Sequence, residues 1–192
     1  MAQPGPEDLP YLREHFVALE DLGRAHGRDL EAVRDATASG RLPAPAYVLA
    51  DGTELVAPDH FALADAAGGE TRLPGWFADA YARAAEGEPA ADPPGEAWRD
   101  YLSGQYAVCL RSVTPFTIVR KAALMARIEE LLASPVEDDS GWREALRAAV
   151  DGLDAIERPF AQCDRAEGPV SRDRLITAVR ERYAGVFARA AA

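Results

Sequence analysis

The segment VALEDLGRAHGRDLEAVRDATASGRLPAPAYVLADGTELV, residues 17–56, carries the pattern that decides the fold. Its apolar residues recur at helical spacing over two stretches, which predicts helices at 19–26 and 30–39. Gly27 and Gly40 stand just past the two ends, where a glycine readily takes the left-handed conformation that terminates a helix. The segment therefore begins with two short, consecutive helices.

A β-hairpin is predicted directly after these helices. Asp51 and Gly52 separate two β-rich runs, AYVL and TELV, and Asp-Gly between such runs is a strong hairpin signal. Helix, turn, helix and hairpin in this order predict an N-terminal domain that is winged helix-turn-helix-like.

The rest of the chain is predicted to be helical, and no extended sheet is expected beyond residue 60. Helices are predicted at 8–15, 59–67, 74–86, 96–110, 115–133, 140–156 and 171–188. Thr114 before Pro115, and Ser171 before the last helix, are the predicted N-caps. The fold class is therefore mainly α, with a C-terminal helical bundle after the winged-helix-like domain.

A stretch rich in proline and glycine, GEPAADPPG at residues 87–95, is the predicted linker between domains. We expect an acidic winged-helix-like domain with trailing helices at 1–86 and a helical domain at 96–192. The first core is predicted to contain Leu19, Leu22, Leu30, Val33, Leu42 and Tyr47. The second core is predicted to contain Leu124, Ile128, Leu131, Leu146, Val150, Leu153, Ile176 and Val179.

Composition and charge narrow the classes of function. Apolar residues make up 48% of the 192 residues, which predicts a folded globular chain, and no apolar run has the about 20 residues of a membrane helix. Two cysteines and a start without a signal-peptide pattern predict a cytoplasmic protein. The three histidines lack metal-ligand spacing, so neither a metal nor another cofactor is expected.

The negative charge is concentrated in the N-terminal half. Residues 1–96 contain 7 basic and 18 acidic residues, whereas residues 97–192 contain 14 of each. The predicted reading helix region, residues 28–41, mixes arginines with carboxylates and has no asparagine, glutamine or lysine to contact base edges. Neither nucleic acid nor a membrane is therefore an expected partner, and a protein partner for this domain is favoured.

Two cation-rich stretches are the candidate ligand sites. No acidic residue occurs from 101 to 128, where Arg111, Arg120 and Lys121 lie around the helix start at Thr114, an arrangement that favours an anion. The alternative is that these cations pair with carboxylates of neighbouring helices.

The second stretch, residues 156–176, places several arginines in a loop before the last helix. Arg158, Arg165 and Arg172 are close in sequence and suit the bidentate binding of an anion. The alternative is a loop held in place by Arg–Asp pairs. If the protein is an enzyme, Asp164 is the candidate catalytic proton acceptor.

Two resemblances bear on these patterns. Residues 17–56, with SGRLPAP before the hairpin, resemble the winged-helix domain of MerR-type and excisionase-type DNA binders. The phrases WRDYLSGQYAVCLRSVTP, RKAALMARIEELLASP, LDAIERPFAQCDR and GPVSRDRLI are similar to an actinobacterial family of unknown function whose members are found with natural-product biosynthesis genes. This second resemblance implies a role in secondary metabolism and supplies no catalytic residues.

Two classes of function remain open. The first is a biosynthetic enzyme or accessory subunit that binds a small anionic or carrier-tethered intermediate. Its substrate-binding residues would be Arg111, Thr114, Arg120, Lys121, Arg158, Arg165 and Arg172. The second is a winged-helix regulator or a protein-interaction module of the same gene cluster.

Overall fold

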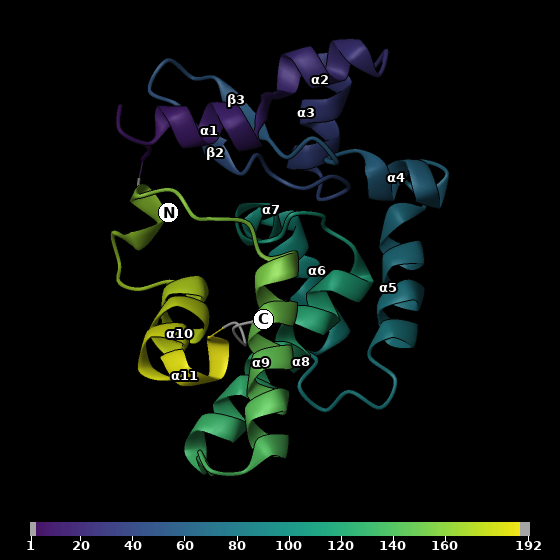
Figure 1. Ribbon diagram of the computed structural model, residues 1–192. Coiled ribbons are helices and arrows are strands. Elements are labelled where there is room, and N and C mark those ends of the chain that lie inside the picture. The colour runs from purple at the N-terminus through teal and green to yellow at the C-terminus, as the bar shows by residue number, and fades with distance from the viewer. Residues whose placement is uncertain (1–2, 189–192) are drawn as a thin grey trace.

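The computed structural model describes residues 3–188 and is mainly helical (Figure 1). Three short helices begin the chain: α1 (Leu9–His15), α2 (Leu19–Ala25) and α3 (Leu30–Ala38). Gly27 and Gly40 follow α2 and α3 with φ of 61° and 67°, as predicted for residues that end a helix.

A small antiparallel sheet lies beside these helices (Figure 1). Strand β3 (Glu54–Val56) is the central strand, between β1 (Val17–Ala18) and β2 (Tyr47–Val48). The predicted hairpin is confirmed as β2 and β3, with Tyr47 opposite Leu55. Strand β1 was not predicted, because a two-residue strand has no alternating pattern to detect. The description of these elements as a winged helix-turn-helix stays a prediction.

The middle of the chain contains α4 (Ala62–Ala67), α5 (Leu73–Ala84), α6 (Pro94–Leu102) and α7 (Gln105–Cys109). The single helix predicted at 96–110 is wrong, since the structure divides it between α6 and α7 at Gly104. Gly104 has φ of 79°, and a Cβ placed on it would lie 2.6 Å from the carbonyl oxygen of Ala44. The break therefore serves the close approach of two backbones.

The C-terminal part is built on two antiparallel helices, α8 (Pro115–Ala133) and α9 (Ser140–Ile156), which lie side by side in Figure 1. Thr114 caps α8 as predicted, in a capping box with Thr117. A π-helical turn (Asp173–Thr177), α10 (Ala178–Arg182) and α11 (Ala184–Phe187) complete the chain.

The single helix predicted at 171–188 is also wrong. Tyr183, with φ of −114° and ψ of 41°, separates α10 from α11, and its ring packs on Trp142 with centroids 5.3 Å apart. Ser171 is not the predicted side-chain cap, because its hydroxyl donates a hydrogen bond to Glu157 instead. Tertiary contacts therefore decide the shape of this segment.

The buried side chains form three clusters, of which one matches the predicted second core and two share the residues of the predicted first core. All eight residues of the predicted second core are buried between α8, α9 and the C-terminal turns. From the predicted first core, Leu19, Val33 and Leu42 are buried together, Leu22 and Leu30 pack at their margin, and Tyr47 belongs to a third cluster with α1.

The predicted linker, residues 87–95, connects α5 and α6, and both helices contribute to the same cluster. The rings of Phe77 and Tyr101 stack with centroids 5.3 Å apart, and the Tyr81 hydroxyl donates to the Asp92 carbonyl at 3.0 Å. The segment is thus held against the helices that it joins, and the division into two domains stays a prediction. None of the described helices has the length and apolar character needed to cross a membrane.

Candidate functional site

Four of the predicted site residues, Arg111, Lys121, Arg158 and Asp164, line clefts beside the point where two chain segments cross at the end of α9. Leu110 and Glu157 form an isolated antiparallel bridge. The Arg111 N–H donates to the Ile156 carbonyl at 2.9 Å, and the Arg158 N–H donates to the Cys109 carbonyl at 3.0 Å. The crossing fixes the backbone on which Arg111 and Arg158 stand, and two clefts open beside it.

The first cleft, called here the arginine cleft, has a volume of about 330 Å³. It lies between the end of α1, the loop before α4 and the crossing. Its lining residues are Glu14, His15, Pro58, Asp59, Arg111, Ser112 and Arg158. The structure thus brings two of the predicted ligand-binding arginines to one cavity.

Arg158 is the buried member of this pair, with 4% of its surface exposed. Its guanidinium donates to the carbonyls of Leu110 at 2.9 Å, His15 at 2.8 Å and Arg111 at 3.3 Å. The guanidinium also lies 4.7 Å from the centre of the Phe16 ring. No carboxylate of the described residues is within ion-pair distance, so backbone dipoles and a ring face are its electrostatic partners.

Arg111 is exposed at the same cleft and has no ion-pair partner within residues 3–188. Two acidic residues, Asp59 and Glu14, complete the polar lining, and Asp59 accepts the Val113 N–H at 3.0 Å. Burial lowers the pKa of His15, and the nearby arginines lower it further, while Glu14 acts in the opposite direction. At neutral pH the cleft therefore presents two guanidinium groups, two carboxylates and a neutral imidazole.

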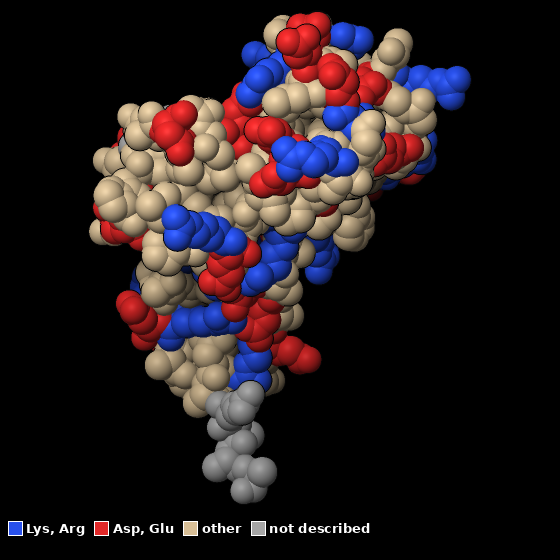
Figure 2. Space-filling model, turned by 90° about the horizontal axis from the view of Figure 1, so that it is seen from above, with Lys and Arg blue, Asp and Glu red and all other residues tan. Residues whose placement is uncertain are grey.

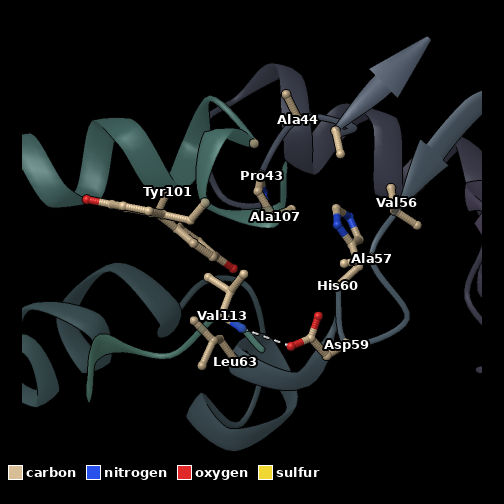
Figure 3. A pocket seen from close by; sticks show the side chains of 13 residues that line it. Pro43, Ala44, Val56, Ala57, Asp59, His60, Leu63, Tyr101, Ala107 and Val113 are labelled. Carbon is tan, nitrogen blue, oxygen red and sulfur yellow. Dashed lines mark hydrogen bonds between the residues drawn. The ribbon is translucent and has the colours of Figure 1, made fainter. Parts of the chain in front are cut away.

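Asp59 also borders a smaller inner cavity, whose lining is shown in Figure 3. His60 lies on the same side as Asp59, across from Tyr101, among small apolar side chains (Figure 3). The volume of about 20 Å³ is the size of one water molecule, which excludes an organic ligand from this conformation. Burial, assisted by Arg28, lowers the pKa of His60 to about 4, so the ring is neutral at pH 7.

The second cleft, called here the lysine cleft, has a volume of about 350 Å³. Its lining residues are Gln105, Val108, Cys109, Lys121, Phe160, Cys163, Asp164, Glu167, Val170 and Ser171. The Lys121 ammonium lies 2.9 Å from Oε1 of Glu157, a fully buried carboxylate, and the Ser171 hydroxyl donates to the same oxygen at 2.6 Å. A buried ion pair thus supports one wall of this cleft.

Asp164, the candidate proton acceptor, lines the lysine cleft and has structural partners. Its Oδ2 accepts the Tyr47 hydroxyl at 2.8 Å and the Ala161 N–H at 2.9 Å. Burial raises the pKa of Asp164, and these two hydrogen bonds oppose the increase. The carboxylate therefore fastens the loop after α9 to strand β2, and its catalytic role stays a prediction.

The remaining predicted site residues lie outside both clefts. Arg165 makes a two-pronged pair with Asp173, both N···O distances being 2.8 Å, and Arg172 pairs with Asp154. The Thr114 hydroxyl takes part in the capping box of α8. Arg120 is exposed on α8 and lines neither cleft. Arg165, Arg172 and Thr114 thus make structural contacts, and Arg120 is exposed to solvent.

Several lining residues were not singled out from the sequence. Asp59, Glu14 and His15 come from the acidic N-terminal half and reach the arginines only through tertiary packing, Glu14 and His15 from the end of α1 and Asp59 from the loop before α4. Glu157 stands beside Arg158 in the sequence, yet nothing in that phrase distinguishes a fully buried carboxylate from a surface one. Within the described residues, no group of three metal-ligating side chains occurs.

A comparison with known protein families identifies the family of this chain. Neither the curated proteins nor the solved structures include a match to this chain. A family model described as a family of unknown function, DUF6058, matches residues 74–184. This range includes the crossing, both arginines of the arginine cleft and all residues of the lysine cleft. Because the match covers more than half of the sequence, this chain belongs to the DUF6058 family.

Proposed function

We propose that this protein binds a small anionic molecule in the arginine cleft. The observation that supports the proposal is Arg158, a buried guanidinium that has no carboxylate partner in the described part of the chain and lines an open cleft beside the exposed Arg111. A buried cation is costly unless it is compensated, and a carboxylate or phosphate accepts from guanidinium groups in a planar, two-pronged geometry. An anionic ligand would supply a full negative charge to the Arg158 guanidinium, whereas the backbone carbonyls supply only partial negative charges.

The acidic lining narrows the class of ligand. Asp59 and Glu14 would repel a molecule that carries only negative charge, and both accept hydrogen bonds from hydroxyl or amine groups. We therefore propose a carboxylate or phosphate carried on a molecule that also bears such donors. The resemblance to proteins found with natural-product biosynthesis genes supports placing this molecule among biosynthetic intermediates, free or tethered to a carrier.

Calorimetric titration with O-phosphoethanolamine, which carries both a phosphate and an ammonium group, and with inorganic phosphate tests the proposal. We expect phosphoethanolamine to bind the unmodified protein more tightly than inorganic phosphate does, and Arg111→Gln to weaken its binding about ten-fold, the usual effect of losing one charge-assisted hydrogen bond. Arg83→Gln, at an exposed position on α5 outside both clefts, is the matched control. Equal affinities for the two variants would reject the cleft as the binding site.

Arg158 is less suited to this test than Arg111. Its replacement would remove hydrogen bonds from three buried or half-buried carbonyls, so binding and folding would be affected together. By contrast, the replacement of an arginine that contacts only the ligand weakens binding and leaves the fold intact.

We propose a second role for the N-terminal elements, in which they contact a protein of the same pathway. Two of the three arginines at residues 28–41 are paired with carboxylates: Arg34 donates to Glu54 of β3 at 2.7 and 2.9 Å, and Arg28 pairs with Asp65 and Glu70. Figure 2, which views the molecule from this side, shows acidic and basic side chains intermingled. A surface of this kind suits a polar protein contact better than a phosphate backbone.

Co-expression with neighbouring gene products tests this second role. Stoichiometric co-purification would support a partner protein, and a winged-helix-like, cytoplasmic accessory subunit is the form that we propose. Sub-micromolar binding to promoter fragments at about 150 mM salt, resistant to competitor DNA, would instead support a transcriptional regulator.

A further inference from the structure

The lysine cleft carries an inference that is independent of the anion site. We propose that it binds a zwitterionic molecule of the amino-acid type, with an ammonium, a carboxylate and an apolar side chain. The argument rests on three parts of the lining: one cation, two carboxylates that have no ion-pair partner among the described residues, and an apolar wall.

Lys121 is the positive part of the lining and the only lysine in the chain, which otherwise uses arginine for its cations. Its side chain is 14% exposed, and its ammonium contacts Oε1 of Glu157 at 2.9 Å. An ammonium has three N–H donors, and this contact needs one of them. The compact charge at the cleft wall therefore retains donors for the carboxylate of a ligand.

Asp164 and Glu167 are the negative part, on the loop that follows α9. Neither carboxylate has an ion-pair partner among residues 3–188, and Oδ1 of Asp164 has no hydrogen-bond partner there although it is buried. Glu167 is exposed at the cleft. Two such carboxylates favour an ammonium group, whereas a ligand that carries only negative charge would be repelled.

The apolar wall comes from Val108, Phe160 and Val170. Together with the charged groups, it matches the three parts of an amino acid with an apolar side chain. The volume of about 350 Å³ is within the range of cavities that hold small molecules. A lone amine would leave the remaining N–H donors of Lys121 without an acceptor from the ligand, and a lone carboxylate would leave Asp164 and Glu167 without a cation, so the zwitterion fits best.

The single lysine gives the experiment a site-specific signal. Protein labelled with [ζ-¹⁵N, ε-¹³C]lysine contains one labelled side chain, and we would titrate it with L-phenylalanine. Phenylacetate, which lacks the ammonium, and phenethylamine, which lacks the carboxylate, are the matched probes. We expect a saturable shift of the Lys121 signal with phenylalanine and at least about ten-fold weaker binding of both other probes. No saturable shift, or equal affinity for all three compounds, would overturn the proposal.

Variants separate this cleft from the arginine cleft. Glu167→Gln should weaken phenylalanine binding several-fold, whereas Glu129→Gln, at an exposed position on α8 outside both clefts, should leave it unchanged. Thermal melts verify that both variants fold. Arg111→Gln should leave phenylalanine binding intact; if it abolishes binding, the amino acid occupies the arginine cleft and the inference is wrong.

Discussion

The arginine cleft and the nearby ion pairs use the same residue type for different purposes. Arg172 and Arg180 share the carboxylate of Asp154, which stands only four residues before Arg158 in the sequence. These paired arginines fasten the C-terminal turns to α9, whereas Arg158 contacts carbonyls and lines a cleft. Proximity in sequence therefore says little about the role of an arginine, and the presence of a carboxylate at ion-pair distance says much more.

The largest loss of stability is expected at an ion pair, the buried contact between Lys121 and Glu157. Lys121→Met would leave the fully buried Glu157 carboxylate without its cation, and we expect a loss of about 3–5 kcal/mol in unfolding free energy. Urea unfolding measures this loss. The double variant Lys121→Met/Glu157→Gln should recover most of it, because no buried charge remains. A double variant as unstable as the single one would show that packing, rather than charge, sets the cost.

The next largest effect is expected from acid, which should lower stability through His60 beside the arginine cleft before it affects the ion pairs. The pKa of His60, beside the arginine cleft, is about 4 in the folded protein and about 6.5 in an unfolded chain. The unfolded state therefore binds the proton first, and stability falls as the pH decreases from about 6.5 to about 4, by about 3 kcal/mol in total. Above pH 6.5 this residue makes no pH-dependent contribution.

The arginine pairs of Asp154 and Asp173 should keep their contribution to stability over the same pH interval. Hydrogen bonds from arginines lower the pKa of Asp154 and of Asp173, so their stabilisation is lost only below the ordinary pKa of an aspartate. The raised pKa of Asp164 has the opposite sign and adds some stability as it protonates. The test is urea unfolding at pH 7, 6, 5 and 4.5: His60→Gln should flatten the decline, and an unchanged slope in that variant would assign the decline to other groups.

A smaller loss is expected from Asp154→Asn, which removes the carboxylate that Arg172 and Arg180 share. These side chains are 20–35% exposed, so solvent screening limits the effect to about 1–3 kcal/mol. Asp151→Asn is the matched control, since Asp151 is 53% exposed and, among residues 3–188, pairs with Arg180 alone; we expect at most about 1 kcal/mol. Chemical denaturation compares the two, and equal losses would show that the shared carboxylate has no special importance.

The smallest effect on stability is expected at Arg111. Its side chain is exposed and has no ion-pair partner among the described residues, so Arg111→Gln should change the unfolding free energy by at most about 0.5 kcal/mol. Differential scanning calorimetry without ligand checks this. A much larger loss would mean that Arg111 has a structural role similar to that of the paired arginines, which would weaken the case for the arginine cleft.

The helices and cores followed largely from local rules. Apolar spacing located both cores, and cap chemistry placed the start of α8 at Thr114 and the ends of α2 and α3 at glycines. These features depend on neighbours a few residues apart, which the sequence displays directly. The two helices that were predicted as continuous are divided at Gly104 and Tyr183, where distant parts of the chain impose the break.

The amino-acid sequence by itself determined that the chain is mainly helical, where its cores lie and that its C-terminal half is rich in arginine. Only the tertiary structure decided which cations are paired. Arg165 and Arg172 found carboxylates within twenty residues, whereas Arg158 reached the carbonyl of His15, 143 residues away. A pattern in the sequence reports charge and spacing, but the free energy of a charge depends on the groups within a few ångströms of it, and these come from every part of the fold.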